Sequence, residues 1–302
     1  MKFGLIGHPI EHSLSPALFK AGYNGMYPYD LIITENFEEA YKRFLEGYDG
    51  INVTSPFKEL ALRKADIISE ECRLVGATNL LIKTPEGIAA YNSDFRGLKI
   101  LLQNFLECIP NANKAPSGAV SFASARLSKK VEAAMTPVEQ RETACPSGLS
   151  RSDWGLNNRP RTLVLGAGGA GKAAKAAAEA LGYETVVINR TQYSPEIKPL
   201  SSFAEEFRKA DIVIYNLPVR IPEIDMLTEA DLCPGKEKVI LEANYMNPSF
   251  DNGSIQRMVN MNPLIRYIDG REWLLQQAVT GYELFTRRAP DCEAMKAIIK
   301  SK

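Results

Sequence analysis

Residues 161–182, RTLVLGAGGAGKAAKAAAEALG, contain the pattern that decides the fold of this chain. An apolar strand at 161–165 runs directly into a glycine-rich turn, and the turn opens an alanine-rich helix. Glycines permit the tight turn, and they let backbone amides approach a pyrophosphate at the helix N-terminus. This context favours a dinucleotide-binding turn made of Gly166, Ala167, Gly168, Gly169, Ala170 and Gly171. The alternative, a closely packed glycine turn without a ligand, stays open.

The segments after this turn continue to alternate between strand and helix. Strands are predicted at 185–189, 211–216 and 238–242, and Ser202 is expected to cap the helix between the first two. Such alternation after a glycine turn is typical of a doubly wound, Rossmann-type domain. We therefore predict a nucleotide-binding domain over residues 160–267.

The residues after the second strand of this domain indicate which dinucleotide it binds. NAD-binding domains usually carry Asp or Glu here, which holds the ribose 2′-hydroxyl. This chain has Asn189, Arg190 and Thr191 instead. An acid would repel a 2′-phosphate, whereas the Arg190 guanidinium can pair with it. The sequence thus favours NADP over NAD as cofactor. The alternative is that Arg190 is a solvated loop residue.

The first hundred residues show a second alternation of strands and helices. Strands are predicted at 2–7, 29–33 and 50–54, a hairpin over 80–91 and a helix over 98–106. One helix begins at Ser15-Pro16 with Ser15 as its expected cap, and another follows the cap residue Asn36. This order predicts an α/β domain with a parallel or mixed sheet, so the fold class is α/β with two domains.

Composition excludes several classes of function. Lys plus Arg and Asp plus Glu are 36 each in 302 residues, which removes any global electrostatic case for nucleic-acid or membrane binding. The five cysteines are scattered, which predicts reduced thiols in a cytoplasmic protein. Two histidines make a histidine-rich metal site hard to build, so we expect no metal.

Residues 108–159 differ in texture from the rest of the chain. They are rich in Ser, Ala, Pro, Arg and Asn, and only 127–135, LSKKVEAAM, suggest a short helix. We predict a flexible insertion between the two domains that takes no part in the site.

Several polar residues follow predicted strands or open predicted helices. Ser13 and Ser15 place two hydroxyls at a helix start, where a carboxylate can bind, although helix capping is the favoured explanation for these residues taken alone. Lys58 follows a strand and can donate a proton, although most lysines simply face solvent. Asn79 and Asp94 supply an amide and an acid, but each alone is also typical of turns.

Taken together and in this order, these segments resemble the shikimate dehydrogenase family. The matching stretches are GHPIEHSLSP (7–16), NVTSPFK (52–58), GATN (76–79), NSDFRG (92–97), GAGGAGKA (166–173), NRT (189–191), EANYMNP (242–248) and GREWLLQQA (270–278). They span nearly the whole chain apart from the predicted insertion.

The resemblance implies an activity and a division of labour. A substrate domain over 1–107, completed by C-terminal helices within 268–302, would accompany the NADP domain. Family members reduce 3-dehydroshikimate to shikimate in chorismate and aromatic amino-acid biosynthesis. By motif position, Lys58 and Asp94 would be the catalytic pair. The implied substrate-binding residues are Ser13, Ser15, Thr54 and Tyr245 for the carboxylate, and Asn52, Asn79 and Gln277 for the ring oxygens.

The chain departs from the family pattern at four places. Ser194 stands where a second basic residue is frequent, and 216–221, NLPVRI, lacks the Gly-Met of the usual segment near the nicotinamide. Glu242 replaces a common Asp, and Trp273 a common Met. Two alternatives therefore remain: a quinate/shikimate dehydrogenase that uses NAD, and a nucleotide-binding sensor without catalysis. The only partner expected is a small-molecule substrate, and a homodimer is left open.

Overall fold

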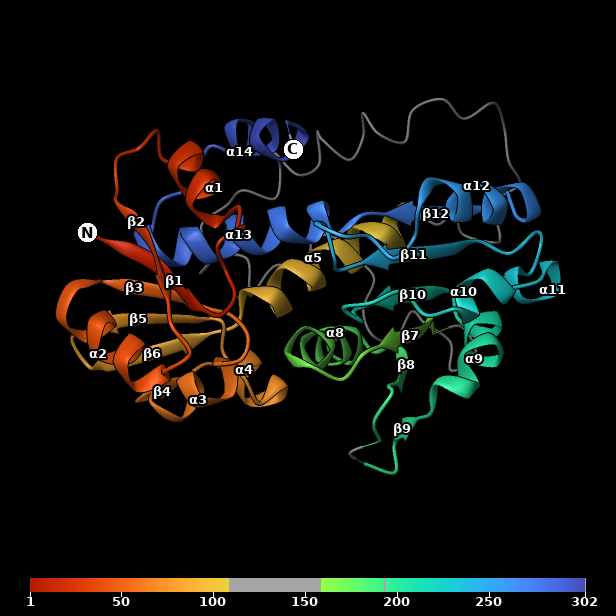
Figure 1. Cartoon of the computed structure of the whole chain (residues 1–302), viewed down its shortest axis with the longest axis horizontal. Helices are drawn as coiled ribbons and strands as arrows, with labels where there is room; N and C mark the ends of the chain where they lie inside the picture. The colour runs from red at the N-terminus through yellow and green to blue at the C-terminus, as the bar shows by residue number, and fades with distance from the viewer. Residues whose placement is uncertain (109–158, 193, 302) are drawn as a thin grey trace.

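The computed structural model describes residues 1–108, 159–192 and 194–301, and it contains two six-stranded sheets (Figure 1). Nearly all of the predicted insertion, including the predicted helix at 127–135, lies outside these residues. The α/β fold class with two sheets, the second of them Rossmann-type, is confirmed. The exact division of the chain into domains stays a prediction.

The first sheet is mixed, with the strand order β2-β1-β3-β5-β6-β4. Its strands are β1 (Phe3–Gly7), β2 (Tyr29–Ile33), β3 (Gly50–Val53), β4 (Ile67–Ile68), β5 (Leu80–Thr84) and β6 (Gly87–Tyr91). β1 runs parallel to β2 and β3, whereas β5 and β6 form the predicted antiparallel hairpin. The carboxyl ends of β1 and β3 therefore lie side by side, and the first-domain site residues follow them.

Five helices in the described part of the chain accompany this sheet: α1 (Ser15–Gly22), α2 (Phe37–Gly47), α3 (Lys58–Arg63), α4 (Glu70–Val75) and α5 (Ser93–Cys108). Three of them, α1, α2 and α5, were predicted. Asn36 caps α2 as predicted, because its Oδ1 accepts from the amides of Glu38 and Glu39 at 3.0 and 3.3 Å. α5 begins at Ser93, earlier than predicted, because Asn92 Oδ1 accepts from the amide of Phe95.

The prediction that Ser15 caps α1 is wrong. Ser15 is the first residue of the helix, and the N-cap, Leu14, makes no side-chain capping bond. The amide of Ser15 instead donates to Ser13 Oγ at 3.2 Å. Proline is accepted at the first or the second position of a helix. Pro16 is therefore compatible both with a helix that begins at Ser15 and with one that begins at Pro16.

The second sheet is entirely parallel, with the order β12-β11-β10-β7-β8-β9. Its strands are β7 (Arg161–Leu165), β8 (Glu184–Ile188), β9 (Ile197–Lys198), β10 (Ile212–Tyr215), β11 (Lys238–Glu242) and β12 (Ile265–Ile268). Its helices are α8 (Gly169–Ala180), η1 (Leu200–Ser202), α9 (Phe203–Lys209), α10 (Glu223–Met226), α11 (Glu229–Leu232) and α12 (Asn252–Met261). Ser202 ends a 3₁₀ turn in helical conformation, so its side chain does not cap α9 and that prediction is wrong.

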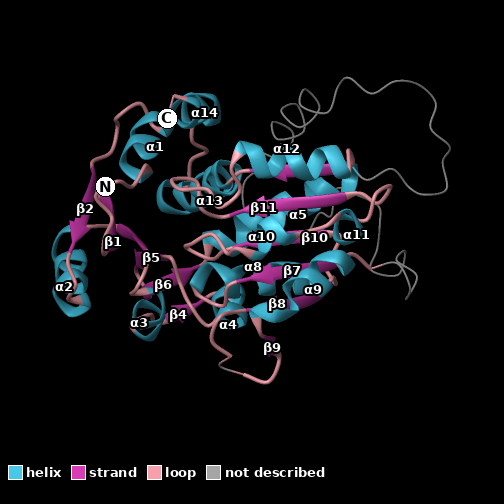
Figure 2. Cartoon of the chain, turned by 45° about the vertical axis from the view of Figure 1, so that its right-hand side comes forward, coloured by secondary structure: helices cyan, strands magenta, loops and turns pink. Residues whose placement is uncertain are grey.

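Both faces of this sheet are covered (Figure 2). Ile212 and Ile214 of β10 pack into the core formed with α5 and α8, whereas Val213 and Tyr215 pack into the core formed with α9 to α12. This alternation follows from the two-residue period of a strand, and it explains the continuous apolar run of the sequence here.

Two C-terminal helices return from the second sheet to the first. α13 (Gly270–Thr286) packs along α5, and the approach is so close that a Cβ on Gly97 would lie 2.6 Å from the amide nitrogen of Gln277. Phe285 near the end of α13 stacks on Phe3 of β1 with 4.8 Å between the ring centroids, and α14 (Cys292–Lys300) packs on α1. Gln277 is thereby brought to the first sheet. No helix in the described part of the chain has the length and apolar character to span a membrane.

Candidate active site

A cavity of about 350 Å³ opens at the carboxyl ends of β1 and β3. It gathers every residue predicted for the substrate and for catalysis, from segments spread over the whole chain. These are Ser13, Ser15, Asn52, Thr54, Lys58, Asn79, Asp94, Tyr245 and Gln277. The structure thus places the predicted residues together, while their individual roles stay predictions.

Lys58 and Asp94 form an ion pair within this cavity. Lys58 is the first residue of α3 and Asp94 lies in the first turn of α5, with 2.6 Å between Nζ and Oδ2. Their side chains are 16% and 8% exposed, so solvent screens the pair little. The backbone is held as well, because Thr78 N donates to the Lys58 carbonyl at 3.1 Å and Trp273 Nε1 donates to the Asp94 carbonyl at 3.0 Å.

Hydroxyl groups gather at another part of the cavity wall. Ser13 Oγ donates to Ser15 Oγ at 3.1 Å, and Tyr282 of α13 donates to the Ser15 carbonyl at 3.0 Å. A tyrosine hydroxyl is protonated at neutral pH, and burial raises the pKa of Tyr245 further. Sequence reasoning missed Tyr282, because an aromatic residue in an apolar helix looks like a core residue. Neutral donors of this kind suit a carboxylate.

The two asparagines of the cavity are oriented by their neighbours. Asn79 exchanges two hydrogen bonds with Ser93: its Nδ2 donates to Oγ at 2.9 Å, and its Oδ1 accepts from the amide at 2.7 Å. Tyr29 donates to Asn52 Oδ1 at 2.8 Å. Because an amide nitrogen carries two hydrogens, Asn79 retains a donor for a ring oxygen. Neither Ser93 nor Tyr29 was predicted: Ser93 lies within the NSDFRG motif but was not assigned a role, and Tyr29 stands in no motif.

The glycine turn has the backbone geometry that a pyrophosphate site requires. Gly166 has φ +102°, and a Cβ on Gly171 would lie 1.9 Å from the Gly166 carbonyl oxygen, so both positions require glycine. No atom lies within 4 Å of a Cβ placed on Gly168, which leaves the approach to the N-terminus of α8 open. The Ala167 amide is directed by Asn189, whose Oδ1 accepts from it at 3.4 Å. These residues fit a bound dinucleotide.

Two further features around the turn fit the same group. Arg190 and Thr191 are exposed directly after β8, and Arg190 has no hydrogen-bond or ion-pair partner among the described residues. Asn216 lies against Gly166, and its Oδ1 is buried without a partner in the described structure. A buried acceptor costs free energy unless a ligand or water satisfies it. Both groups are therefore available to a nucleotide.

The glycine turn and the cavity adjoin each other. A Cβ on Gly169 would lie 3.2 Å from Cδ of Lys58, and Lys172 of α8 pairs with Glu59 of α3 at 2.5 Å. A group bound at the turn would therefore lie beside the Lys58–Asp94 pair. Within the described residues, no cluster of three or more His, Cys, Asp or Glu could hold a metal ion.

Comparison with known proteins finds similarity to one family. A family model described as the shikimate dehydrogenase substrate binding domain matches residues 5–81. The shikimate dehydrogenase (NADP(+)) of Caldanaerobacter subterraneus is 28% identical over 94% of this chain and 91% of that protein. The enzyme of the same name from Pyrococcus furiosus is 26% identical over 98% of this chain and 94% of that protein. The chain is thus similar to shikimate dehydrogenases over nearly its whole length.

The solved structures of the family support the fold. The Thermus thermophilus shikimate 5-dehydrogenase, solved with NADP(H) and shikimate, aligns over 100% of this chain and 99% of its own, with a TM-score of 0.67 and 22% identity. A quinate dehydrogenase from Corynebacterium glutamicum, solved with NAD, aligns with a TM-score of 0.69 and 18% identity. Since both share the architecture, the fold alone does not distinguish between these substrates or cofactors.

Two departures from the family pattern have a structural explanation here. Trp273 uses its indole N–H to hold the Asp94 carbonyl, a contact that a methionine side chain cannot make. Glu242 is fully buried, and its carboxylate accepts hydrogen bonds from the following loop and from Tyr267. Both substitutions therefore support residues at or near the cavity.

Proposed function

We propose that this chain is an NADP-dependent shikimate dehydrogenase (EC 1.1.1.25 type), which catalyses the reversible reduction of 3-dehydroshikimate to shikimate in aromatic amino-acid biosynthesis. The observation that carries the proposal is the enclosed Lys58–Asp94 pair, which lines one cavity with the Ser13 and Ser15 hydroxyls and adjoins the glycine turn. The full-length relatives with the same activity in their names support it.

The residues of the cavity divide the work between binding and proton transfer. Ser13, Ser15, Thr54 and Tyr245 donate hydrogen bonds to the substrate carboxylate. Asn52, Asn79 and Gln277 bind the ring oxygens. Lys58 gives a proton from Nζ to the ketone oxygen as negative charge develops there, and Asp94 keeps the ammonium in place. Such general acid catalysis contributes about 10²–10⁴-fold to the rate.

The second domain would hold the cofactor through its backbone and through Arg190. The glycine turn 166–171 would hold the pyrophosphate through the amides that open α8, since the Gly166 and Ala167 amides donate to the Ile188 carbonyl and to Asn189 Oδ1. Asn189, Arg190 and Thr191 would surround the ribose phosphate. When bound, NADPH supplies the hydride. Arg190 carries the preference for NADP, because none of the described residues pairs with its guanidinium, which can therefore bind the 2′-phosphate. We expect a cytoplasmic enzyme whose partner is its small-molecule substrate, and a homodimer stays open.

The test is a set of four initial-rate measurements on the purified protein, with shikimate or quinate and with NADP or NAD. Reduction of NADP by shikimate at the highest kcat/KM supports the proposal. Preference for quinate with NAD would replace it with the quinate/shikimate alternative. Ser194 favours that alternative, because it stands where a second basic residue is frequent in the family. Cofactor binding without turnover on either acid would favour the sensor.

A further inference from the structure

The loop after β11, residues 243–250, brings Tyr245 and Met246 to the cavity. The first end of the loop is fixed, because Ala243 N donates to the Tyr215 carbonyl at 2.8 Å and extends the β10–β11 ladder. The position of Tyr245 therefore depends on how the far end of the loop is held.

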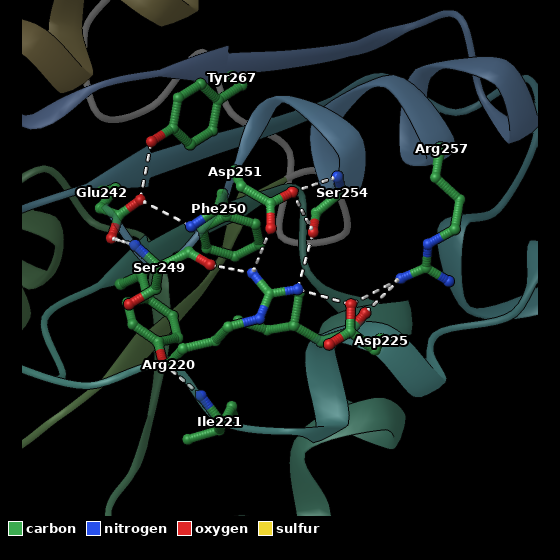
Figure 3. Close-up of polar contacts among 12 residues, drawn as sticks. Arg220, Ile221, Asp225, Glu242, Ser249, Phe250, Asp251, Ser254, Arg257 and Tyr267 are labelled. Atoms are coloured by element: carbon green, nitrogen blue, oxygen red, sulfur yellow. Dashed lines mark hydrogen bonds and ion pairs between the residues drawn. The ribbon is translucent and has the colours of Figure 1, made fainter. Parts of the chain in front are cut away.

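The far end is held first by the buried carboxylate of Glu242 (Figure 3). One oxygen accepts from the amide of Ser249, and the other accepts from the amide of Phe250 at 3.2 Å and from the Tyr267 hydroxyl at 2.7 Å. Glu242 is 0% exposed, so these donors replace the hydrogen bonds that its carboxylate would make with water. The loop thus returns to the strand end from which it started.

Arg220 holds the same end from the other side. Its Nη1 donates to the Ser249 carbonyl, and its Nη2 donates to Ser254 Oγ at 2.7 Å and to Asp225 Oδ1 at 2.5 Å, as Figure 3 shows. Ser249 is therefore bound through its N–H by Glu242 and through its carbonyl by Arg220. Arg220 belongs to the segment 216–221 that departs from the family pattern, so this contact links that segment to the loop.

Aromatic packing adds to the two anchors. The buried Phe250 ring lies 5.3 Å from the Tyr215 ring and 5.8 Å from the Tyr267 ring, measured between centroids. Tyr215 also donates to the Val219 carbonyl at 2.7 Å, which orders the turn that presents Arg220. The strand ends of β10 and β11 and the end of the loop form one connected unit.

We propose that Arg220, acting with Glu242, positions the 243–250 loop and thereby sets Tyr245 at the substrate cavity. Neither charged residue lines the cavity, so both act through the loop and are positioning residues. The part of the proposal that concerns the substrate rests on the proposed function, whereas the part that concerns the loop does not.

Hydrogen exchange tests the loop directly, without any ligand. Arg220→Met should raise the exchange rates of the hydrogen-bonded loop amides, those of Met246, Asn247, Ser249 and Phe250, by about tenfold, since loss of a charge-assisted hydrogen bond shifts a local equilibrium by that factor. Arg257→Met is the matched control: Arg257 lies in the same cluster but donates to the carbonyls of Ile224 and Leu227, away from the loop. Unchanged exchange at these four amides in Arg220→Met would overturn the proposal.

A second variant, Glu242→Gln, tests the proposal independently if Arg220→Met folds poorly. Glu242→Gln keeps the size of the side chain but removes the charge and one acceptor, so the amides of Ser249 and Phe250 should exchange faster. Arg220→Lys should give an intermediate result, because an ammonium cannot reach all the partners of a planar guanidinium. Protection equal to wild type in both variants would also contradict the proposal.

Substrate binding then tests the consequence for Tyr245. In Arg220→Met, the Kd for shikimate without cofactor and the KM should both rise about tenfold with kcat within about twofold, the pattern of lost uniform binding. A faster-exchanging loop with unchanged Kd and KM would exclude the effect on the substrate. If the wild-type protein neither binds nor converts shikimate, the proposed function fails, and the exchange comparison alone decides the role of Arg220.

Discussion

Lys58 Nζ lies 2.6 Å from Asp94 Oδ2, although the two residues are 36 positions apart in the sequence. Each stands in the first turn of a helix that follows a strand of the first sheet, and the cavity encloses both. The pairing gives the ammonium a fixed position and leaves the other carboxylate oxygen available to a ring hydroxyl. The predictions below begin with this pair.

Lys58→Met should lower kcat for shikimate oxidation by about 10²–10⁴-fold, because it removes the group that exchanges the proton. The KM should change far less. Initial rates with NADP and shikimate check this. Lys64→Met is the control, since Lys64 pairs with Glu38 at 2.9 Å on the exposed face of the neighbouring segment and should leave kcat unchanged.

Trp273→Phe should lower kcat by about tenfold while KM stays close to wild type, because the Asp94 backbone loses its indole contact and the Lys58–Asp94 pair is less well placed. The pH profile of kcat should shift along with the rate, which a purely structural loss would not produce. A wild-type kcat and pH profile would show that the indole has no positioning role.

Arg190→Gln should raise the KM for NADP by about tenfold or more, because a charge-assisted hydrogen bond to the 2′-phosphate is lost. The KM for NAD, which lacks this phosphate, should stay within about twofold, so NAD serves as the internal control. Equal effects on the two cofactors would remove Arg190 from the 2′-phosphate site.

Gly171→Ala should destabilise the fold by about 3 kcal/mol, because the added methyl group would lie against the Gly166 carbonyl. Urea unfolding measures the difference. Gly168→Ala is the matched variant: its Cβ meets no atom within 4 Å, so stability should hold while NADP binding weakens. Normal NADP binding in Gly168→Ala would contradict a pyrophosphate site at this turn.

Glu206 predicts how stability depends on acid pH. Burial would raise its pKa, but hydrogen bonds from Lys198 and Arg161 outweigh this and lower the pKa from 4.5 to about 2. A carboxyl whose pKa is lower in the folded state stabilises the fold at any pH above its pKa in the unfolded chain. For Glu206 this stabilisation is lost as the pH falls from about 4.5 to about 2.

The corresponding measurement is the free energy of unfolding of Glu206→Gln against wild type. The pKa shift alone accounts for about 3 kcal/mol at neutral pH. The difference between the two proteins should shrink as pH falls toward about 2. A difference independent of pH over this window would show that the ion pairs of Glu206 do not stabilise the fold.

Much of the fold was accessible from local sequence patterns. The glycine turn after β7, the Asn36 cap and the hairpin over 80–91 each depend on residues close together in the chain, so they were predicted correctly. The strands β4 and β9 were missed, because a strand of two residues shows no periodicity. Ser15 and Ser202 were misassigned as caps, since capping requires a backbone conformation that residue type alone does not specify.

The sequence by itself determined the two α/β units and the glycine turn, because each depends on a short local pattern. The residues of the cavity were predicted through the resemblance of their motifs to a family. Only the tertiary structure decided which distant groups support them: Trp273 reaches Asp94 across 179 positions, and Arg220 reaches Ser249 across 29. Such contacts depend on how helices and strand ends pack in three dimensions, and no periodicity along the chain encodes them.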